Sequence, residues 1–428
     1  MPLSEQDKAE ILDRMKHIVK EKHVNVANPS QDYSAWTASV DARRSALLLA
    51  NDEVFENGVR DLLQALGSSH TGFYKQNGAI PAPHSIQATV SANSEHDRNS
   101  WMFVDVIEDG AADRGGIRPG DLLVAVDGEP IAPPTQPTFR LGRTHRVTVE
   151  SVLGKDVRDV DVSVPDRAAK DRPLMVEPKS VSHKMIERGL GYVRVASFPG
   201  TVGLQFAADL DRALSDLKAS GCDHLVVDLR GNIGGGLGSL RLMSYLCPGK
   251  LPIGYSLTRR RLRSGYDPKA LPRIGKIPST RLAQIGMALR FKVIHKDRSL
   301  ALFTEGLGPQ PWHGRATVLI NEHTASAAEM VAGFVKENAL AKLVGTRSSG
   351  QVLGGANFKL PADYTLRIPV AGWYSWSGSC IEGCGVEPDH VTPAVRTDLA
   401  SDSDRPLRTA LGLLQSPVAE NGKMATTN

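Results

Sequence analysis

The chemistry that this sequence could support begins at a serine that directly follows an apolar strand. The stretch RATVLI, residues 315–320, is typical of a buried strand, and TASAAEMVAGF, residues 324–334, repeats apolar residues at helical spacing. Ser326 is therefore predicted at a strand-to-helix turn, where free N–H groups and the helix dipole favour negative charge. An attacking serine and the oxyanion that it generates need these conditions. The structural alternative is that Thr324 or Ser326 only caps the helix.

A second candidate feature is the glycine-rich turn DLRGNIGGG, residues 228–236, which follows the apolar residues HLVV. Glycines let bare backbone N–H groups face a ligand, which suits an oxyanion hole and also a phosphate cradle. The turn has neither the Lys-Ser/Thr pair of a P-loop nor GxGxxG spacing, so it is a weak phosphate motif.

A serine nucleophile also needs a base that accepts its proton. His70 lies in the small-residue turn GSSHTGFY, residues 67–74, although a lone histidine is more often structural than catalytic. His323 stands three residues before Ser326 and is an alternative base, but so near a neighbour on the same turn rarely has the correct approach. The residues by themselves leave this choice open.

The composition is that of a globular protein. Hydrophobic residues make up 41% and charged residues 23% of the 428 residues, and this length predicts two or three domains. With 51 basic and 47 acidic residues, the net charge of +4 gives no indication of a nucleic-acid partner. The most basic stretch, TRRRLRSG at 258–265, is predicted to be a solvated loop rather than an anion or membrane contact.

The sequence predicts neither export nor a membrane span. Residues 1–23 are charged and amphipathic without an apolar core, and no run reaches bilayer length, so we expect a cytoplasmic protein. Four cysteines do not predict a disulfide scaffold. Cys380 and Cys384 have no matching His/Cys pair, so we expect neither a metal site nor a cofactor.

The residue pattern divides the chain into parts. Residues 1–75 have helical apolar spacing, residues 76–168 alternate short strands and turns, and residues 169–415 alternate strands with amphipathic helices. The last pattern predicts an α/β layer with a partly parallel sheet. Within it, the basic and weakly periodic residues 250–312 are predicted to be an insertion or cap, and residues 416–428 a disordered tail.

Five segments, in this order, resemble the S41 family of serine peptidases, which comprises the C-terminal processing peptidases and their tricorn-core relatives. The resemblance implies a crotonase-like α/β core with a mixed α+β sheet, an N-terminal helical region and an inserted PDZ-like domain. The segments are GSSHTGFY, the PDZ-like AADRGGIRPGDLLVAVDGEPI, GYVRVASF with DLRGNIGGG, INEHTASAAEMVAGFVKENALAKLVGT, and IEGCGVEPDH.

The resemblance implies that Ser326 is the nucleophile. It also implies an oxyanion hole made by the N–H of Ala327 and a backbone N–H of Gly234 or Gly235. No metal or cofactor takes part in this chemistry.

One departure from the family pattern concerns the base. The processing branch places a lysine twenty-five residues after the serine, and this position is Gln351 here. An amide cannot accept the serine proton. Because Lys342 and Lys359 are out of register, a Ser-Lys dyad is disfavoured.

The tricorn-like branch resembles this chain more closely at the site. It pairs its serine with a histidine before the PDZ-like module and a glutamate from the C-terminal part, which implies His70 as the base and Glu382 as the orienting carboxylate. Glu387 is the alternative for the third role. Gln351 would then line the site and contact the substrate.

PDZ-type domains bind extended peptides by adding them as a strand at a sheet edge. In this chain SWMFVDV, residues 100–106, is the predicted peptide-binding strand. The stretch PPTQPTFRLGRTHR, residues 133–146, departs from the helical segment usual in such domains, so the groove is expected to be altered or not functional.

The leading functional hypothesis is a serine endopeptidase that cleaves unfolded or C-terminal peptide segments through an acyl-enzyme. The partner is then a protein or peptide substrate, and a homo-oligomer is compatible with the family. Two alternatives remain: a catalytically silent peptide-binding protein, and a serine esterase or amidase. A true triad predicts activity that rises with pH through the imidazole titration, near 6.5 before any environmental shift.

Overall fold

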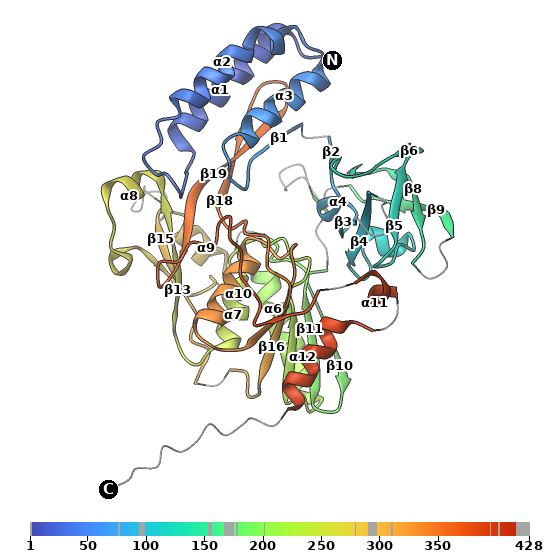
Figure 1. Ribbon diagram of the computed structural model, residues 1–428. Helices are drawn as coiled ribbons and strands as arrows, with labels where there is room; N and C mark the ends of the chain where they lie inside the picture. Colours follow the sequence, from blue (N-terminus) through green and yellow to red (C-terminus); the bar gives the residue numbers. More distant parts are fainter. Residues whose placement is uncertain are drawn as a thin grey trace.

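The computed structural model has three parts: an N-terminal helical layer, a small β module and an α/β body (Figure 1). This arrangement confirms the predicted fold class, a mixed α/β protein with an N-terminal helical region and an inserted β-rich domain. The structure describes residues 2–75, 78–93, 99–152, 156–166, 175–176, 179–200, 202–278, 280–289, 298–309, 311–393, 395–400 and 403–416. Of the disordered tail predicted over 416–428, only residue 416 lies within this set.

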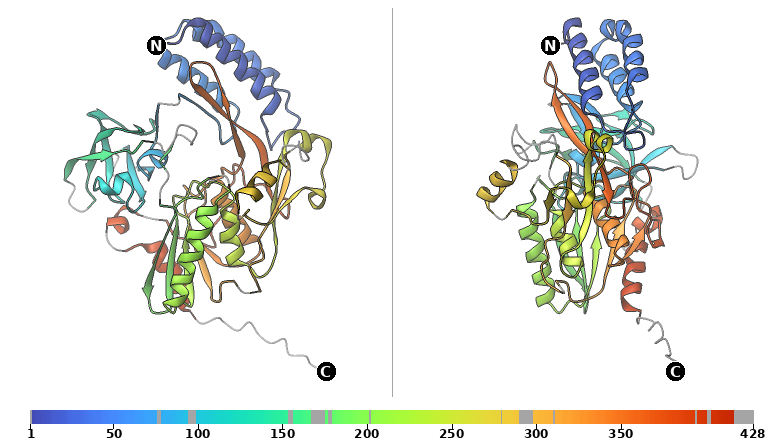
Figure 2. Two further views of the ribbon diagram at one scale, coloured as in Figure 1. Left: turned by 180° about the vertical axis from the view of Figure 1, so that it is seen from behind. Right: turned by 90° about the vertical axis from the view of Figure 1, so that its left-hand side faces the viewer.

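The N-terminal layer consists of the helices α1 (Glu5–Lys22), α2 (Ser34–Leu49) and α3 (Asp52–Gln64). α1 begins where the Ser4 hydroxyl accepts a backbone N–H, and α3 begins where the Asn51 side chain does the same. The apolar faces of the helices share one core with a long strand hairpin, which leads from this layer down into the body (Figure 2). The hairpin consists of β18 (Gly354–Lys359) and β19 (Tyr364–Ser375).

The β module is a sheet of strand order β3-β4-β5-β8-β9, in which β6 pairs with β5. Its strands are β3 (Ala88–Asn93), β4 (Ser100–Val106), β5 (Leu122–Val126), β6 (Glu129–Pro130), β8 (Thr144–Glu150) and β9 (Val157–Ser163). Beside them lie the strand pair β2 (Ala79–Pro81) and β7 (Thr138–Arg140) and the short helices α4 (Ala82–Ser85) and α5 (Ala111–Arg114).

The strand expected to receive a peptide lies inside this sheet. β4 pairs with β3 on one side and with β5 on the other, so most of its backbone groups already have partners. The prediction for residues 100–106 is therefore wrong, and the terminal strand on this side of the sheet is β3. The stretch 133–146 contributes turns and two strands instead of a helix, in agreement with its unusual sequence.

The α/β body is built on a sheet of order β10-β11-β12-β16-β17-β20, which is parallel from β11 onward. Side chains alternate across it: Leu225 and Val227 face the core of one side, and Val226 faces the opposite side. Helices α6, α7 and α10 cover the first face and α12 covers the second. The elements are β10 (Val181–Glu187), β11 (Leu190–Val195), α6 (Leu204–Ala219), β12 (His224–Asp228), α7 (Ser239–Leu246), β16 (Ala316–Ile320), α10 (Ala327–Glu337), β17 (Lys342–Gly345), β20 (His390–Val391), α11 (Arg396–Ala400) and α12 (Arg405–Gln415).

The segment 250–312, predicted as an insertion or cap, supplies strands to a second sheet. This sheet has the order β1-β19-β13-β15-β14, with β18 also paired to β19. The remaining elements are β1 (Gly72–Lys75), β13 (Pro252–Thr258), α8 (Arg259–Ser264), the 3₁₀ turn Pro268–Ala270, β14 (Arg273–Ile274), α9 (Arg281–Leu289) and β15 (Leu300–Phe303). Three strands of the segment thus belong to the body of the protein.

The arginine-rich stretch 258–265 forms helix α8 and is not a solvated loop, so that prediction is wrong. Arg259 donates hydrogen bonds to the carbonyl oxygens of Lys20 and Gln31, and Arg263 donates to those of Pro29 and Ser30. These arginines fasten the connection between α1 and α2 to the second sheet.

The parallel strands bring the two candidate turns together. β12 and β16 are neighbours in register, with Asp228 opposite Leu319. The carboxyl ends of parallel strands meet at one edge of a sheet, so the glycine-rich turn after β12 and the serine turn after β16 emerge side by side. β1 and β18 lead into the same region from the second sheet.

Candidate active site

Ser326 stands at the first turn of α10 in an unusual backbone conformation. Its φ of 56° and ψ of −122° lie in a region that residues with a side chain rarely adopt. The Ser326 N–H donates to the Gln351 carbonyl at 2.8 Å and to the Glu329 carboxylate at 3.1 Å. Such strain costs about 1–3 kcal/mol and persists only where the surroundings fix it.

Glu329 supplies much of that fixation. Its side chain is fully buried and accepts the Ser348 hydroxyl at 2.7 Å, the Gly350 N–H at 2.7 Å and the Gln351 N–H at 2.8 Å, besides the Ser326 N–H. Burial raises the pKa of Glu329, while these donors act in the opposite direction. One carboxyl group thus joins the serine turn to the loop 348–351.

Gly234 lies directly against the serine. A Cβ atom on Gly234 would come within 2.5 Å of the Ser326 Cβ and 2.8 Å of the Ala327 nitrogen, and its φ is +91°. Only glycine fits this position. The Gly234 N–H donates to the Asn232 side-chain oxygen at 2.8 Å, whereas the N–H groups of Gly235 and Ala327 have no hydrogen-bond acceptor among the described residues. These two free N–H groups are the available oxyanion donors.

His70 is linked to Glu382 through a residue that sequence reasoning missed, Ser69. The Ser69 hydroxyl lies 3.0 Å from the Glu382 Oε2 and 2.8 Å from the His70 Nδ1, and the Ser69 N–H donates to Oε1 at 3.0 Å. Because the hydroxyl has one proton, which it donates to the carboxylate, it accepts a hydrogen bond from Nδ1–H. This tautomer leaves the lone pair on Nε2, as a general base requires.

The peptide unit between Gln351 and Val352 is hydrogen-bonded to Ser326 on one side and to Glu382, the partner of the His70 segment, on the other. The Gln351 carbonyl accepts the Ser326 N–H, and the N–H of Val352, in the same peptide plane, donates to Glu382 Oε2 at 2.9 Å. The nucleophile and the carboxylate that orients His70 are therefore close neighbours. Among the described residues, no hydrogen bond joins the Ser326 hydroxyl to His70.

The surroundings keep His70 neutral. Burial, and to a smaller extent the positive charge of Arg367, lower the pKa of His70 from its ordinary value of 6.5 to about 4. The backbone of His70 is in the left-handed region, with a φ of 60°. A neutral imidazole at physiological pH can accept a proton.

The alternative candidates have other partners. The His323 Nε2 lies 2.8 Å from the Ser91 hydroxyl of the β module, and burial lowers the pKa of His323. Glu387 is exposed and forms an ion pair with Arg347. The Gln351 side chain is exposed at the edge of the site, while its backbone N–H and carbonyl hold Glu329 and Ser326.

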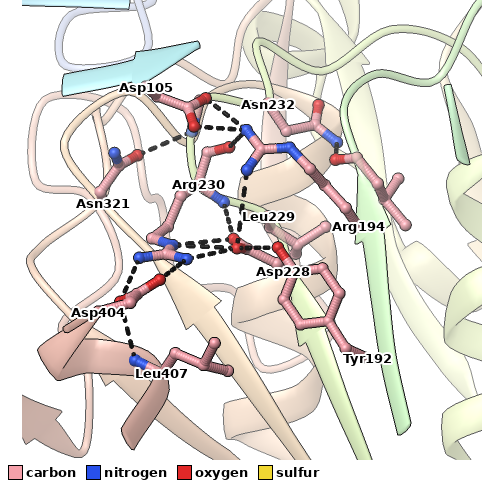
Figure 3. A network of polar contacts seen from close by, with 12 residues as sticks. Asp105, Tyr192, Arg194, Asp228, Leu229, Arg230, Asn232, Asn321, Asp404 and Leu407 are labelled. Carbon is pink, nitrogen blue, oxygen red and sulfur yellow. Dashed lines mark hydrogen bonds and ion pairs between the residues drawn. The ribbon is translucent and has the colours of Figure 1, made fainter. Parts of the chain in front are cut away.

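A buried ion-pair network lies beside the glycine-rich turn (Figure 3). Arg230 binds Asp228 at 2.6 Å and Asp404 at 2.6 Å, and Arg194 lies 3.8 Å from Asp228. Although burial alone would raise it, the charges of Arg230 and Arg194 lower the pKa of Asp228 to about 2. The Tyr192 hydroxyl donates to the same carboxylate at 2.7 Å.

This network also reaches the β module. Asp105 of β4 binds Arg194 of β11 at 2.5 Å, and a Cβ atom on Gly231 would come within 2.0 Å of the Asp105 carboxylate. The Gly231 N–H donates to the Asn321 side chain at 3.0 Å. The β module is therefore in close contact with the turn that carries Gly234 and Gly235.

The described residues contain no group of three or more histidine, cysteine, aspartate or glutamate side chains arranged to hold a metal ion. None of the described helices has the length and apolarity that crossing a bilayer requires.

Two family models match parts of the chain. The sequence model of peptidase family S41 matches residues 189–392, and the model of a PDZ domain matches residues 102–149. Over these residues the chain is similar to peptidase family S41. The S41 match contains Ser326 and Glu382 but not His70, so it does not by itself identify the base.

Proteins similar to this chain carry names from both branches. A carboxy-terminal-processing protease from Bartonella bacilliformis is 27% identical over 69% of this chain and 59% of its own length. A tricorn protease homolog from Streptomyces coelicolor is 24% identical over 89% of this chain and 30% of its own length. The chain thus spans less than two thirds of the length of these curated relatives.

The fold recurs in solved structures. Mature CPAF, in its complex with lactacystin, has a TM-score of 0.55 at 16% identity, with 96% of this chain and 97% of CPAF covered. Such low identity establishes the shared fold only.

Proposed function

We propose that this chain is a serine endopeptidase with Ser326 as nucleophile and His70 as base. The observation that carries the proposal is the peptide unit between Gln351 and Val352, which binds the Ser326 backbone on one side and Glu382 on the other. Through this unit a serine, an imidazole and a carboxylate gather at one place, although they come from three distant parts of the chain.

In the proposed first step, the Ser326 hydroxyl attacks the carbonyl carbon of the scissile bond while the His70 Nε2 accepts its proton. Ser69 and Glu382 are positioning residues, because they hold the Nδ1–H and stabilise the imidazolium as it forms. Closure onto substrate must bring Nε2 to the hydroxyl, since catalytic hydrogen bonds often tighten only in the complex.

The negative charge that develops on the substrate oxygen is stabilised by the free N–H groups of Ala327 and Gly235. Ala327 is the first residue of α10, so the helix dipole adds to this effect. His70 then returns its proton to the leaving amine. Water, deprotonated by the same imidazole, attacks the acyl carbon, and His70 returns that proton to the Ser326 oxygen as the acyl group leaves.

The proposed substrate class is an unfolded or C-terminal peptide segment. Two findings support it: the relative from Bartonella bacilliformis is named a carboxy-terminal-processing protease, and a PDZ domain model matches the β module. PDZ-type domains bind extended peptides. A folded substrate protein has few extended segments that could enter the site around Ser326.

The proposal is tested with a fluorophosphonate probe, which reacts with activated serines. We expect one adduct on the wild-type chain, none on Ser326→Ala, and an unchanged adduct on the control Ser264→Ala, which removes an exposed hydroxyl on α8. A wild-type chain that never reacts would refute the nucleophile and support the silent peptide-binding alternative.

Unfolded casein separates a peptidase from an esterase or amidase. We expect casein fragments from the wild type and none from Ser326→Ala. Hydrolysis of small acyl esters with intact casein would contradict the endopeptidase assignment.

A further inference from the structure

A second charged group lies beside the catalytic elements, the guanidinium of Arg367 on β19. Arg367 pairs with Gly72 of β1, two residues after His70, and with Asn357 of β18 on its other side. Paired residues of antiparallel strands lie about 5 Å apart, and two extended residues span at most about 7 Å. A long arginine side chain at this position can reach the surroundings of His70.

The charge of Arg367 has no partner of opposite sign. Its one side-chain hydrogen bond runs from Nη1 to the Asn357 side-chain oxygen at 3.2 Å, and among the described residues no carboxylate lies within ion-pair distance of it. An arginine has five N–H donors. Most of these donors therefore remain available, on a side chain that is only partly exposed.

A glycine of β18 makes room for the guanidinium. A Cβ atom on Gly355 would lie 2.9 Å from the Arg367 Nη2 and 3.1 Å from its Nε, so this group lies over the bare backbone of β18. A Cβ atom on Gly72 would lie 3.7 Å from both the Arg367 Cβ and the Tyr74 ring. The guanidinium thus lies over the bare backbone of β18, while the Arg367 Cβ and the Tyr74 ring lie near Gly72 of β1.

The groups on which the charge of Arg367 acts belong to the segment of His70 and to the β module. After burial, its positive charge is the next cause that lowers the pKa of His70 and the pKa of His84, and it acts on Tyr74 in the same direction. His84 belongs to α4, at the start of the β module. The uncompensated charge therefore lies where β1, β18 and the module meet, beside the base.

We propose that Arg367 binds a carboxylate of the peptide substrate and so directs cleavage to bonds near a chain end or near an acidic side chain. This inference rests on the proposed peptidase function and names its substrate class. The planar guanidinium matches a carboxylate, and a charge-assisted bond at a partly buried position is stronger than one in water. The negative charge comes either from a terminal α-carboxylate or from an aspartate or glutamate side chain.

Two pairs of fluorogenic peptides distinguish these sources. One pair has the same sequence with a free C-terminal carboxylate or a carboxamide, and the other has an internal glutamate or glutamine. We expect wild-type kcat/KM to be about tenfold higher for the charged member of at least one pair, with the difference mainly in KM. The pair that shows the preference identifies the source of the carboxylate.

At a pH well above the acid limb of both proteins, the variant Arg367→Gln should remove this preference and leave hydrolysis of the neutral peptides within about twofold of the wild type. The control Arg146→Gln, which removes an exposed arginine on β8, should retain it. A wild type with no preference in either pair, or a preference that persists in Arg367→Gln, would overturn the inference.

Binding to an inactive protein separates this inference from the proposed function. Fluorescence anisotropy with Ser326→Ala should show about tenfold tighter binding of the charged peptide, and the double variant with Arg367→Gln should bind both members equally. Equal binding to Ser326→Ala would refute the carboxylate site even if the wild type cleaves peptides. Selective binding without any cleavage by the wild type would refute only the peptidase.

Discussion

At the scale of single residues, the site depends on a serine held in strain and a histidine held in one tautomer. Ser326 keeps its left-handed φ because Gln351 and Glu329 accept its N–H. His70 keeps Nε2 free because Ser69 accepts its Nδ1–H. Neither condition follows from residue types alone, since both are set by hydrogen bonds.

Ser69 provides the first prediction at this scale. Removing its hydroxyl in Ser69→Ala disconnects His70 from Glu382, so the wrong tautomer becomes populated and the imidazolium loses its partner. We expect kcat to fall about 100-fold with little change in KM, which is within the usual range for a general base. Steady-state kinetics on one peptide measure this effect. Ser68→Ala is the matched control, and equal losses in both variants would contradict the role of Ser69.

The second prediction concerns pH. Since the pKa of His70 is lowered to about 4, the neutral imidazole persists below pH 6.5, where an ordinary histidine would be protonated. The acid limb of kcat/KM should therefore lie well below pH 6.5. Removing the positive charge in Arg367→Gln should shift this limb toward higher pH. An unshifted limb near 6.5 in the wild type would contradict the described surroundings of His70.

The same shift affects stability with a definite sign. In the unfolded state this histidine has its ordinary pKa of 6.5, whereas in the folded state its pKa is about 4. Between these pH values the unfolded chain binds a proton at His70 and the folded chain does not. The folded chain is therefore destabilised by this group as the pH falls from about 6.5 toward 4.

At the scale of elements, the glycine-rich turn is held from two sides. Asn321 of the serine turn accepts the Gly231 N–H, and Asp105 of the β module lies against Gly231 while it binds Arg194. Both contacts act on the turn that ends in Gly235. A change in the position of the β module should therefore change the position of the Gly235 N–H, which is one of the oxyanion donors.

The variant Asp105→Ala tests this connection. It removes the module's partner of a buried arginine, and breaking a buried pair costs about 3–5 kcal/mol. We expect a lower free energy of unfolding and a kcat about tenfold lower on a short peptide. Denaturant unfolding and kinetics measure the two effects. Glu108→Ala, an exposed acid of the same module, should change neither; an unchanged kcat in Asp105→Ala would show that the turn is independent of the module.

At the scale of the whole molecule, sequence patterns predicted the parallel body, its serine turn and the β module, because these depend on local periodicity and glycine-rich turns. They could not place strands whose partners are remote. From a weakly periodic segment, β13 pairs with the remote β19 and β15 extends the sheet beside β13, and β4 lies inside its sheet rather than at an edge.

Ser69 escaped sequence reasoning for a similar reason. Its partner Glu382 is 313 residues away, and a serine in a small-residue turn gives no signal of its own. The only available sign was its position directly before the candidate base. The resemblance to S41 peptidases pointed to His70 and Glu382, but the hydrogen-bonded connection between them is a property of the fold.

The most direct test of the account is the dependence of Ser326 acylation on His70. The rate of fluorophosphonate labelling, followed by intact mass, should fall to background in His70→Ala and remain measurable in Gln351→Ala, whose backbone contacts are retained. The exposed His17 on α1 offers the control His17→Ala, which should label at the wild-type rate. Labelling that survives in His70→Ala and disappears in Gln351→Ala would contradict the histidine-based mechanism.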